Sequence, residues 1–293
     1  MAERIVKANG IEIWTEDFGD PSDPAVLLVM GASAQGIFWP DEFCDQIVAA
    51  GRYVIRFDNR DVGQSTCFDF ATDPYTLPDM ARDAVGVLDA YGIECAHVVG
   101  ASMGGMICQT LAIEHPERVI SFTSIMSSPG GGAVAQAIQG GEAEAALPAP
   151  TQEVIEAAMA SQLNPPTSRE ARIEQRLHLF RILSGSLAPY DEAEHRALFE
   201  HEHDRARNWD AQNNHGLAVA ASSDRRAALS SVKAPALVIH GTEDPILPYE
   251  HGVATANAIP GCKLLTIEKM GHDMPEVAWP QIIGAIVEHT GAR

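Results

Sequence analysis

The sequence predicts an α/β fold in which helices flank a mostly parallel central sheet, and three observations support this. Short apolar runs such as residues 25–30 alternate with amphipathic stretches of helical length. The apolar runs are continuous, which is typical of strands buried on both faces of a sheet. Between residues 127 and 229 the alternation stops, and helical stretches without a convincing strand follow one another. We therefore expect one core domain, residues 1–126 and 230–293, interrupted by a helical cap of residues 127–229.

Each element is predicted from its local pattern. Residues 11–15 alternate apolar and polar side chains, as a half-exposed strand does, and the later runs are apolar throughout. The expected strands span residues 11–15, 25–30, 53–57, 96–99, 234–240 and 263–267. Pro78 suits the first turn of a helix and Gly92 suits a position just after its end. The expected helices span residues 40–50, 78–91, 106–115 and 281–289.

Charge and composition exclude several classes of partner. The 40 Asp and Glu residues outnumber the 20 Lys and Arg residues, so the net charge is −20. Nucleic acids and anionic membranes attract basic surfaces, and neither is expected as a partner. The five cysteines include no C-x-x-C pair, and neither a leader segment nor a spanning segment is evident. These features predict a cytoplasmic protein. We expect a monomer or a homodimer whose partner is a small-molecule substrate.

The strand at residues 96–99 leads directly into Gly-Ala-Ser-Met-Gly at residues 100–104. This G-x-S-x-G pattern, placed between a strand and a helix, is typical of a tight turn that lifts a serine hydroxyl clear of the sheet. The serine is Ser102, the candidate nucleophile. The alternative is a glycine-rich connection in which the serine is incidental.

A serine hydroxyl needs a base to take its proton and an acid to orient that base. Asp244 follows the strand at 234–240, and His272 follows the strand at 263–267, so both are expected at the same sheet edge as Ser102. The alternatives are Glu243 or Asp273 for the acid and His240 for the base. Asp244 is preferred to Glu243 because it precedes a proline and has the shorter side chain. His240 is expected to be structural because it ends an apolar strand.

Two backbone amides are expected to bind the oxyanion of the reaction. One belongs to Met103, directly after the nucleophile, and the other to Ala32 in the loop after residues 25–30. Ser33 in that loop is interpreted as a turn residue. We expect Phe38, Trp39 and Met126 to line the substrate pocket, although each also suits the core.

Two acidic, histidine-containing stretches at residues 191–195 and 200–204 could suggest a metal site. No H-E-x-x-H motif is present, and His201 and His203 are two residues apart, so they point in different directions on a helix. A solvated acidic helix face is the preferred interpretation, and neither a metal nor a cofactor is expected. Asp58 and Arg60 are expected to brace the loop near the nucleophile.

The Ser102, Asp244, His272 order resembles that of the α/β hydrolase superfamily. Residues 17–21, 30–31, 39–43 and 61–65 are further similar to the aclacinomycin-type anthracycline methylesterases, although Met30 stands where many hydrolases have histidine. The resemblance implies an α/β-hydrolase fold and a serine carboxylic-ester hydrolase that forms an acyl-enzyme without a cofactor. The implied substrate is a medium-to-large neutral ester, such as a methyl ester or macrocyclic ester of a polyketide.

Other functions stay open at this point. The same three residues serve lactonases, thioesterases and hydrolases of carbon–carbon bonds. Dehalogenases and epoxide hydrolases of similar fold use an aspartate nucleophile, which Ser102 argues against. A binding protein of this fold without catalytic activity is the alternative from a different class.

Overall fold

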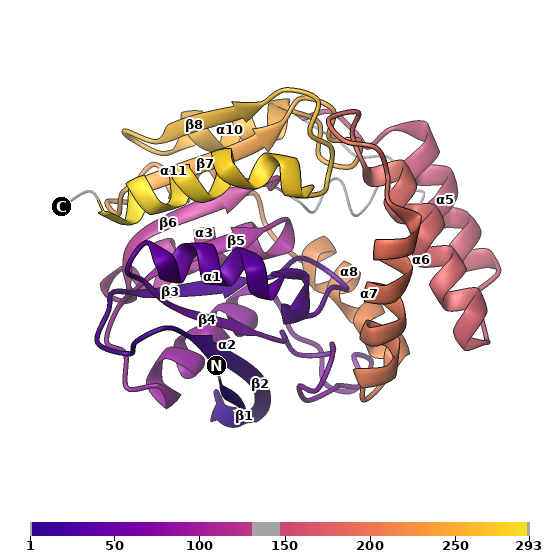
Figure 1. Ribbon diagram of the computed structural model, residues 1–293, viewed down its shortest axis with the longest axis horizontal. Helices are drawn as coiled ribbons and strands as arrows, with labels where there is room; N and C mark the ends of the chain where they lie inside the picture. Colours follow the sequence, from indigo (N-terminus) through magenta and orange to yellow (C-terminus); the bar gives the residue numbers. More distant parts are fainter. Residues whose placement is uncertain (1, 131–146, 292–293) are drawn as a thin grey trace.

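The computed structural model describes residues 2–130 and 147–291, and these residues form one eight-stranded sheet (Figure 1). The strand order is β1-β2-β4-β3-β5-β6-β7-β8. Strand β2 pairs antiparallel with β1 and β4, and every other pairing is parallel. The strands are β1 (Ala2–Ala8), β2 (Ile11–Phe18), β3 (Ala25–Val29), β4 (Tyr53–Phe57), β5 (Ala96–Ala101), β6 (Val119–Ile125), β7 (Ala236–Gly241) and β8 (Lys263–Ile267). The predicted mostly parallel α/β architecture is confirmed.

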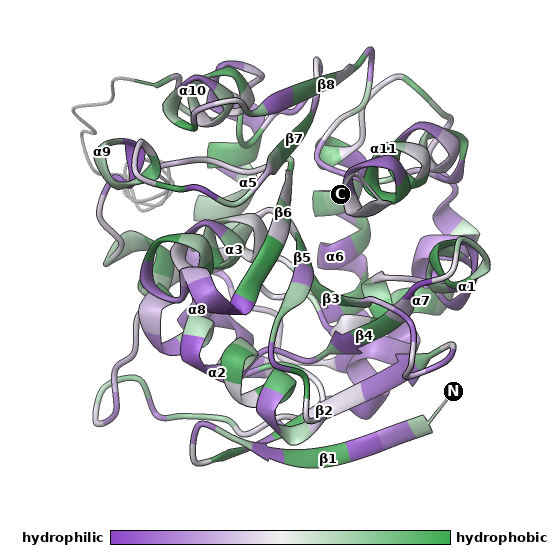
Figure 2. Cartoon of the chain, turned by 90° about the vertical axis from the view of Figure 1, so that its left-hand side faces the viewer, coloured by the Kyte–Doolittle hydropathy of each residue, from purple (hydrophilic) through white to green (hydrophobic). Residues whose placement is uncertain are grey.

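Helices cover both faces of the sheet. Figure 2 shows α1 (Asp41–Ala49) and α11 (Trp279–Gly291) on one side of the strands. On the other side lie α2 (Leu77–Ala90), α3 (Met103–Glu114) and α10 (Glu250–Ala258). One apolar cluster fills each side, and the alternate residues of β3 divide between them, with Leu27 on the α3 side and Leu28 on the α1 side. Short 3-10 turns are η1 (Gly36–Phe38), η2 (Pro116–Arg118) and η4 (Glu276–Ala278).

Among the described residues between β6 and β7, the regular elements are all helices. In Figure 1, α5, α6 and α7 stand together along one side of the molecule. The elements are α5 (Gln152–Leu163), α6 (Arg169–Leu183), α7 (Glu192–Arg205), η3 (Trp209–Asn213), α8 (Asn214–Ala220) and α9 (Arg226–Leu229). Residues 131–146 of the expected cap lie outside the described residues. The other residues of the range 127–229 are called the cap below.

Two strands and one α-helix of the core were not predicted from the sequence, namely β1, β6 and α10. Strand β6 carries Ser121, Thr123 and Ser124 in its buried centre, so it lacks a continuous apolar run. Ser121 bonds the His97 ring at 2.8 Å, and Ser124 accepts a hydrogen bond from Gln109 at 3.2 Å. These partners lie on β5 and α3, so the local sequence of β6 does not reveal why the hydroxyls of Ser121 and Ser124 tolerate burial.

Candidate active site

Ser102 occupies a strained turn between β5 and α3. Its backbone has φ 54° and ψ −120°, a conformation that costs a non-glycine residue on the order of 1–3 kcal/mol. The flanking glycines are required by space. A Cβ on Gly100 would lie 2.2 Å from the carbonyl oxygen of Gly104, and one on Gly104 would lie 2.0 Å from that of Val29. The turn therefore packs α3 tightly against β3 and β5 and leaves the serine partly exposed.

Ser102, His272 and Asp244 form a continuous hydrogen-bonded chain. His272 Nε2 lies 3.0 Å from Ser102 Oγ, and His272 Nδ1 lies 2.7 Å from Asp244 Oδ2. Asp244 follows β7 and His272 follows β8, and these neighbouring parallel strands bring the two loops together. The backbone amide of His272 donates to the carbonyl of Leu183 at the end of α6 (2.8 Å), so the cap holds the histidine loop.

The environment of Asp244 keeps its carboxylate ionised. Burial raises its pKa, but the adjacent His272 and His240 outweigh burial and hold the pKa well below its usual range. Asp244 Oδ1 accepts from the amides of Ile246 (3.0 Å) and Leu247 (2.8 Å). A carboxylate fixed in this way can orient an imidazole and stabilise its cation.

The alternative acids, Glu243 and Asp273, and the alternative base, His240, have different surroundings. Glu243 accepts hydrogen bonds from the amide (2.7 Å) and hydroxyl (3.0 Å) of Ser186, across the boundary with the cap. Burial raises the pKa of Asp273. His240 is fully buried, with its Nε2 2.7 Å from the carbonyl oxygen of Leu247 and 3.4 Å from Asp244 Oδ2. His240 therefore contacts the Asp244 carboxylate from within the buried core.

The loop after β3 passes directly beside the serine. A Cβ on Gly31 would lie 3.0 Å from Ser102 Cβ and 3.6 Å from its Oγ. Met103 is the first residue of α3, where an amide has no partner within the helix, and helix N-termini favour negative charge. The amides of Ala32 and Met103 thus belong to the two segments that flank the serine, and their role as oxyanion donors stays a prediction.

The three expected pocket residues differ in exposure. Trp39 is 0% exposed and packs on Phe43 with ring centroids 5.3 Å apart, so in this structure its side chain belongs to the apolar core. Met126 is also buried, in the same apolar cluster. Phe38 is partly exposed, and the centroid of its ring lies 5.9 Å from that of Phe180 in the cap.

The acidic stretch of α7 is only partly solvated. Glu202 is buried and pairs with Arg176 of α6 at 2.7 Å, which corrects the expectation of a solvated acidic face. Within residues 2–130 and 147–291, no three His, Cys, Asp or Glu side chains are arranged to hold a metal ion. None of the helices described in that part of the chain is both long and apolar enough to cross a bilayer.

Comparison with known proteins identifies the family. The alpha/beta hydrolase fold family matches residues 24–278. The chain belongs to this family. Rhodomycin D methylesterase DnrP of Streptomyces peucetius is 35% identical over 300 residues, covering 100% of this chain and 99% of the relative. DauP of Streptomyces sp. (strain C5), also a rhodomycin D methylesterase, is 34% identical over the same coverage.

Solved structures agree on the fold. The esterase EaEST from Exiguobacterium antarcticum has a TM-score of 0.78 and 19% identity, covering 99% of this chain and 100% of its own. The two Streptomyces relatives, which match the whole chain, are named methylesterases. The sequence prediction of a carboxylic-ester hydrolase with the α/β-hydrolase fold is confirmed.

Proposed function

We propose that this chain hydrolyses carboxylic esters through a Ser102–His272–Asp244 triad. One observation carries the proposal: the unbroken chain from Ser102 Oγ through both ring nitrogens of His272 to Asp244, with steps of 3.0 and 2.7 Å. Both distances are hydrogen-bond lengths, as proton transfer from a nucleophile to its base requires.

The proposed reaction has two halves. In the first, Ser102 Oγ bonds to the ester carbonyl carbon while its proton moves to His272 Nε2. The carbonyl oxygen becomes an oxyanion, which the amides of Ala32 and Met103 stabilise. The tetrahedral intermediate then breaks its bond to the leaving oxygen, which takes the proton from His272 and departs as the alcohol.

In the second half, water attacks the acyl-enzyme and passes a proton to His272. The second tetrahedral intermediate releases the carboxylic acid, and Ser102 Oγ regains the proton. Asp244 stays ionised throughout and stabilises the imidazolium in both halves. The protein supplies the nucleophile, the base and the oxyanion donors, so the scheme needs no cofactor.

The proposed substrate is a medium-to-large neutral ester, with the methyl ester of an aromatic polyketide favoured. The support is the printed activity of the two full-length relatives, both named rhodomycin D methylesterases. We propose that residues 127–229 act as the cap that closes over this substrate. We also propose a cytoplasmic location, because the five cysteines are scattered along the sequence and include no C-x-x-C pair.

The test combines labelling with turnover. Wild-type protein is expected to react with a fluorophosphonate at Ser102 and to cleave members of a panel of p-nitrophenyl esters, polyketide methyl esters, macrocyclic esters, lactones and thioesters. Ser102→Ala should lose both properties. Ser231→Ala, at an exposed position after α9, is the control and should keep both. Full esterase activity in Ser102→Ala would refute the mechanism, and binding without turnover by the wild type would favour a binding protein.

A further inference from the structure

The cap contacts the loop that carries Ala32 through every polar group of the next residue, Ser33. The Ser33 amide donates to His215 Nδ1 (2.9 Å), its carbonyl accepts from Arg176 Nη2 (2.7 Å), and its hydroxyl donates to the carbonyl of Gln212 (3.0 Å). These partners belong to α8, α6 and η3. Ser33 has a φ of 58°, so its backbone has a left-handed conformation that is disfavoured for serine. The cap contacts hold it there.

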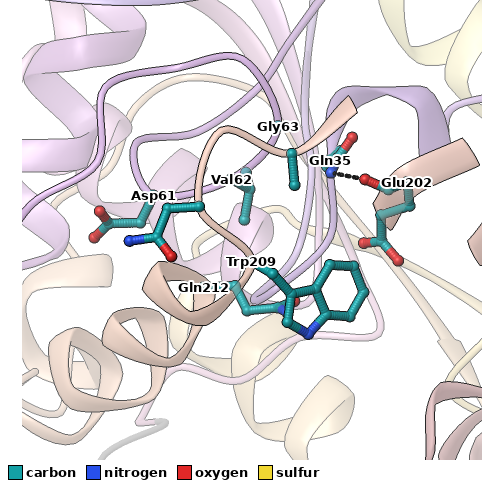
Figure 3. Close-up of a pocket in the computed structure, with 9 residues that line it drawn as sticks. Gln35, Asp61, Val62, Gly63, Glu202, Trp209 and Gln212 are labelled. Carbon is teal, nitrogen blue, oxygen red and sulfur yellow. Dashed lines mark hydrogen bonds between the residues drawn. The ribbon is translucent and has the colours of Figure 1, made fainter. Parts of the chain in front are cut away.

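A second residue of the loop repeats the arrangement. Gln35 is buried, and its Nε2 donates to the carbonyl of Glu202 on α7 at 2.8 Å, as Figure 3 shows. Its Oε1 accepts from the guanidinium of Arg205 on the same helix. The adjoining cavity, lined by Gln35, Glu202 and Gln212 among others, has a volume of about 10 Å³, the space of one water molecule. Both polar atoms of the Gln35 side chain therefore join the loop to α7.

The cap residues that hold Ser33 are themselves fixed. Arg176 makes two bonds to the buried Glu202 carboxylate, at 2.7 and 3.2 Å. Its guanidinium also lies 5.2 Å from the Phe180 ring centroid. His215 is fully buried, and its Nε2 lies 2.7 Å from the carbonyl oxygen of Arg60.

The hydrogen bonds of His215 define its protonation. An amide is always a donor, so Nδ1 facing the Ser33 amide must be the unprotonated acceptor, and Nε2–H donates to Arg60. Burial lowers the pKa of His215, in agreement with a neutral ring. On the other side of Ala32, the core holds the loop through Asn59, which donates to the carbonyl of Met30 at 2.9 Å.

We propose that Arg176 and His215 are positioning residues, which hold Ser33 so that the preceding amide, that of Ala32, faces the oxyanion of the reaction. This inference rests on the proposed function. The cap would then complete the catalytic centre as well as cover the substrate. Because an oxyanion donor acts on the transition state, losing these contacts should lower kcat and leave KM nearly unchanged.

Two substitutions of His215 separate this role from a structural one. In His215→Asn, the side-chain oxygen replaces Nδ1 and keeps an acceptor for the Ser33 amide. In His215→Gln, the longer side chain replaces Nε2 and keeps a donor for the Arg60 carbonyl. Each variant removes one buried hydrogen bond, so their losses of stability should be similar.

We expect His215→Gln to lower kcat by about 10- to 100-fold, the range for a catalytic group displaced by up to 1 Å, with KM changed less than threefold. His215→Asn should retain most of the wild-type kcat. The rate of fluorophosphonate labelling of Ser102 should follow kcat in both. Equal kcat values in the two variants, after correction for folded fraction, would overturn the inference.

Arg176→Lys is a second, independent variant in case the histidine substitutions prevent folding. Lysine keeps a cation beside Glu202 but lacks the planar fork that serves both Glu202 and the Ser33 carbonyl, so kcat should fall with KM unchanged. Arg169→Lys is the control and should leave kcat unchanged, because Arg169 lies on the same helix as Arg176 but makes an exposed pair with Asp204 of α7. An unchanged kcat in Arg176→Lys would refute the role of Arg176. A wild type that neither cleaves esters nor labels would refute the proposed function, and the inference with it.

Discussion

Replacing Arg176 by methionine should strongly destabilise the protein, because it leaves Glu202 as a buried charge without its partner. The Glu202 side chain is 1% exposed, and that of Arg176 is 10% exposed. Removing one member of a buried pair typically costs about 3–5 kcal/mol, since the remaining charge is desolvated without compensation. Methionine preserves much of the length and the apolar contacts of arginine, so the loss reports mainly on charge. We expect a decrease of about 3–5 kcal/mol in the free energy of unfolding at pH 8.

The loss should depend on pH with a defined sign. Burial already raises the pKa of Glu202 above its ordinary 4.5 in the presence of Arg176, and removal of the cation raises it further. A carboxyl whose pKa is higher in the folded state takes up a proton on folding as the pH falls. The stability loss of Arg176→Met is therefore full above the raised pKa and shrinks as the pH falls towards 4.5.

The assay is urea unfolding followed by tryptophan fluorescence at pH 5 and pH 8. The double variant Arg176→Met/Glu202→Met removes both charges and should recover to within about 1 kcal/mol of the wild type, because apolar replacements of buried pairs are well tolerated. Arg169→Met, in a pair with exposed side chains, should show no measurable change. A loss below about 1 kcal/mol in the single variant at pH 8, or a double variant as unstable as the single one, would refute the reasoning.

Three further predictions follow. Asp244→Asn should lower kcat by about 10⁴-fold in steady-state assays, because an amide group cannot hold the catalytic imidazole in the required tautomer; a loss below tenfold would contradict this. Gly104→Ala should abolish soluble expression or lower the thermal midpoint sharply, since its Cβ would lie 2.0 Å from a carbonyl oxygen of β3. Gly216→Ala, exposed on α8 with no atom within 4 Å of its Cβ, should instead raise stability by up to about 1 kcal/mol. Burial raises the pKa of the Cys108 thiol, and that of Cys44 to about 12, so neither should react with Ellman's reagent at pH 8 until the protein unfolds; rapid reaction in the native protein would show that they are accessible.

The residues of the candidate triad were predictable because each follows its own strand. Ser102, Asp244 and His272 come directly after β5, β7 and β8, and parallel strands present their carboxyl ends at one edge of the sheet. The order of the residues along the chain and the strand pattern were therefore enough to bring them together. No long-range information was needed beyond the expectation of a parallel sheet.

The contacts between the cap and the loop were not predictable in the same way. His215 is 182 residues from Ser33 along the chain, and Arg176 is 143 residues from it. Nothing in the local pattern of α6 or α8 distinguishes these two residues from surface polar residues. Trp39 shows the same limit, because its burial depends on the distant packing of α1 and α11, which the local pattern does not show.

The insertion of the cap between β6 and β7 has a consequence for how the enzyme can diversify. The two ends of the cap meet beside the sheet, where the backbone amide of Arg225 donates to the carbonyl of Pro129 at 2.8 Å. Doubling the length of a loop with fixed ends costs only about 0.6 kcal/mol, so the sheet tolerates large changes there. Ser33 and Gln35 bind residues of the segment from α6 through α8, so the sequence of that segment is constrained. In α5, by contrast, only Val154 is buried. Substrate range should therefore change most freely through α5, where new sequence disturbs neither the sheet nor the loop beside the serine.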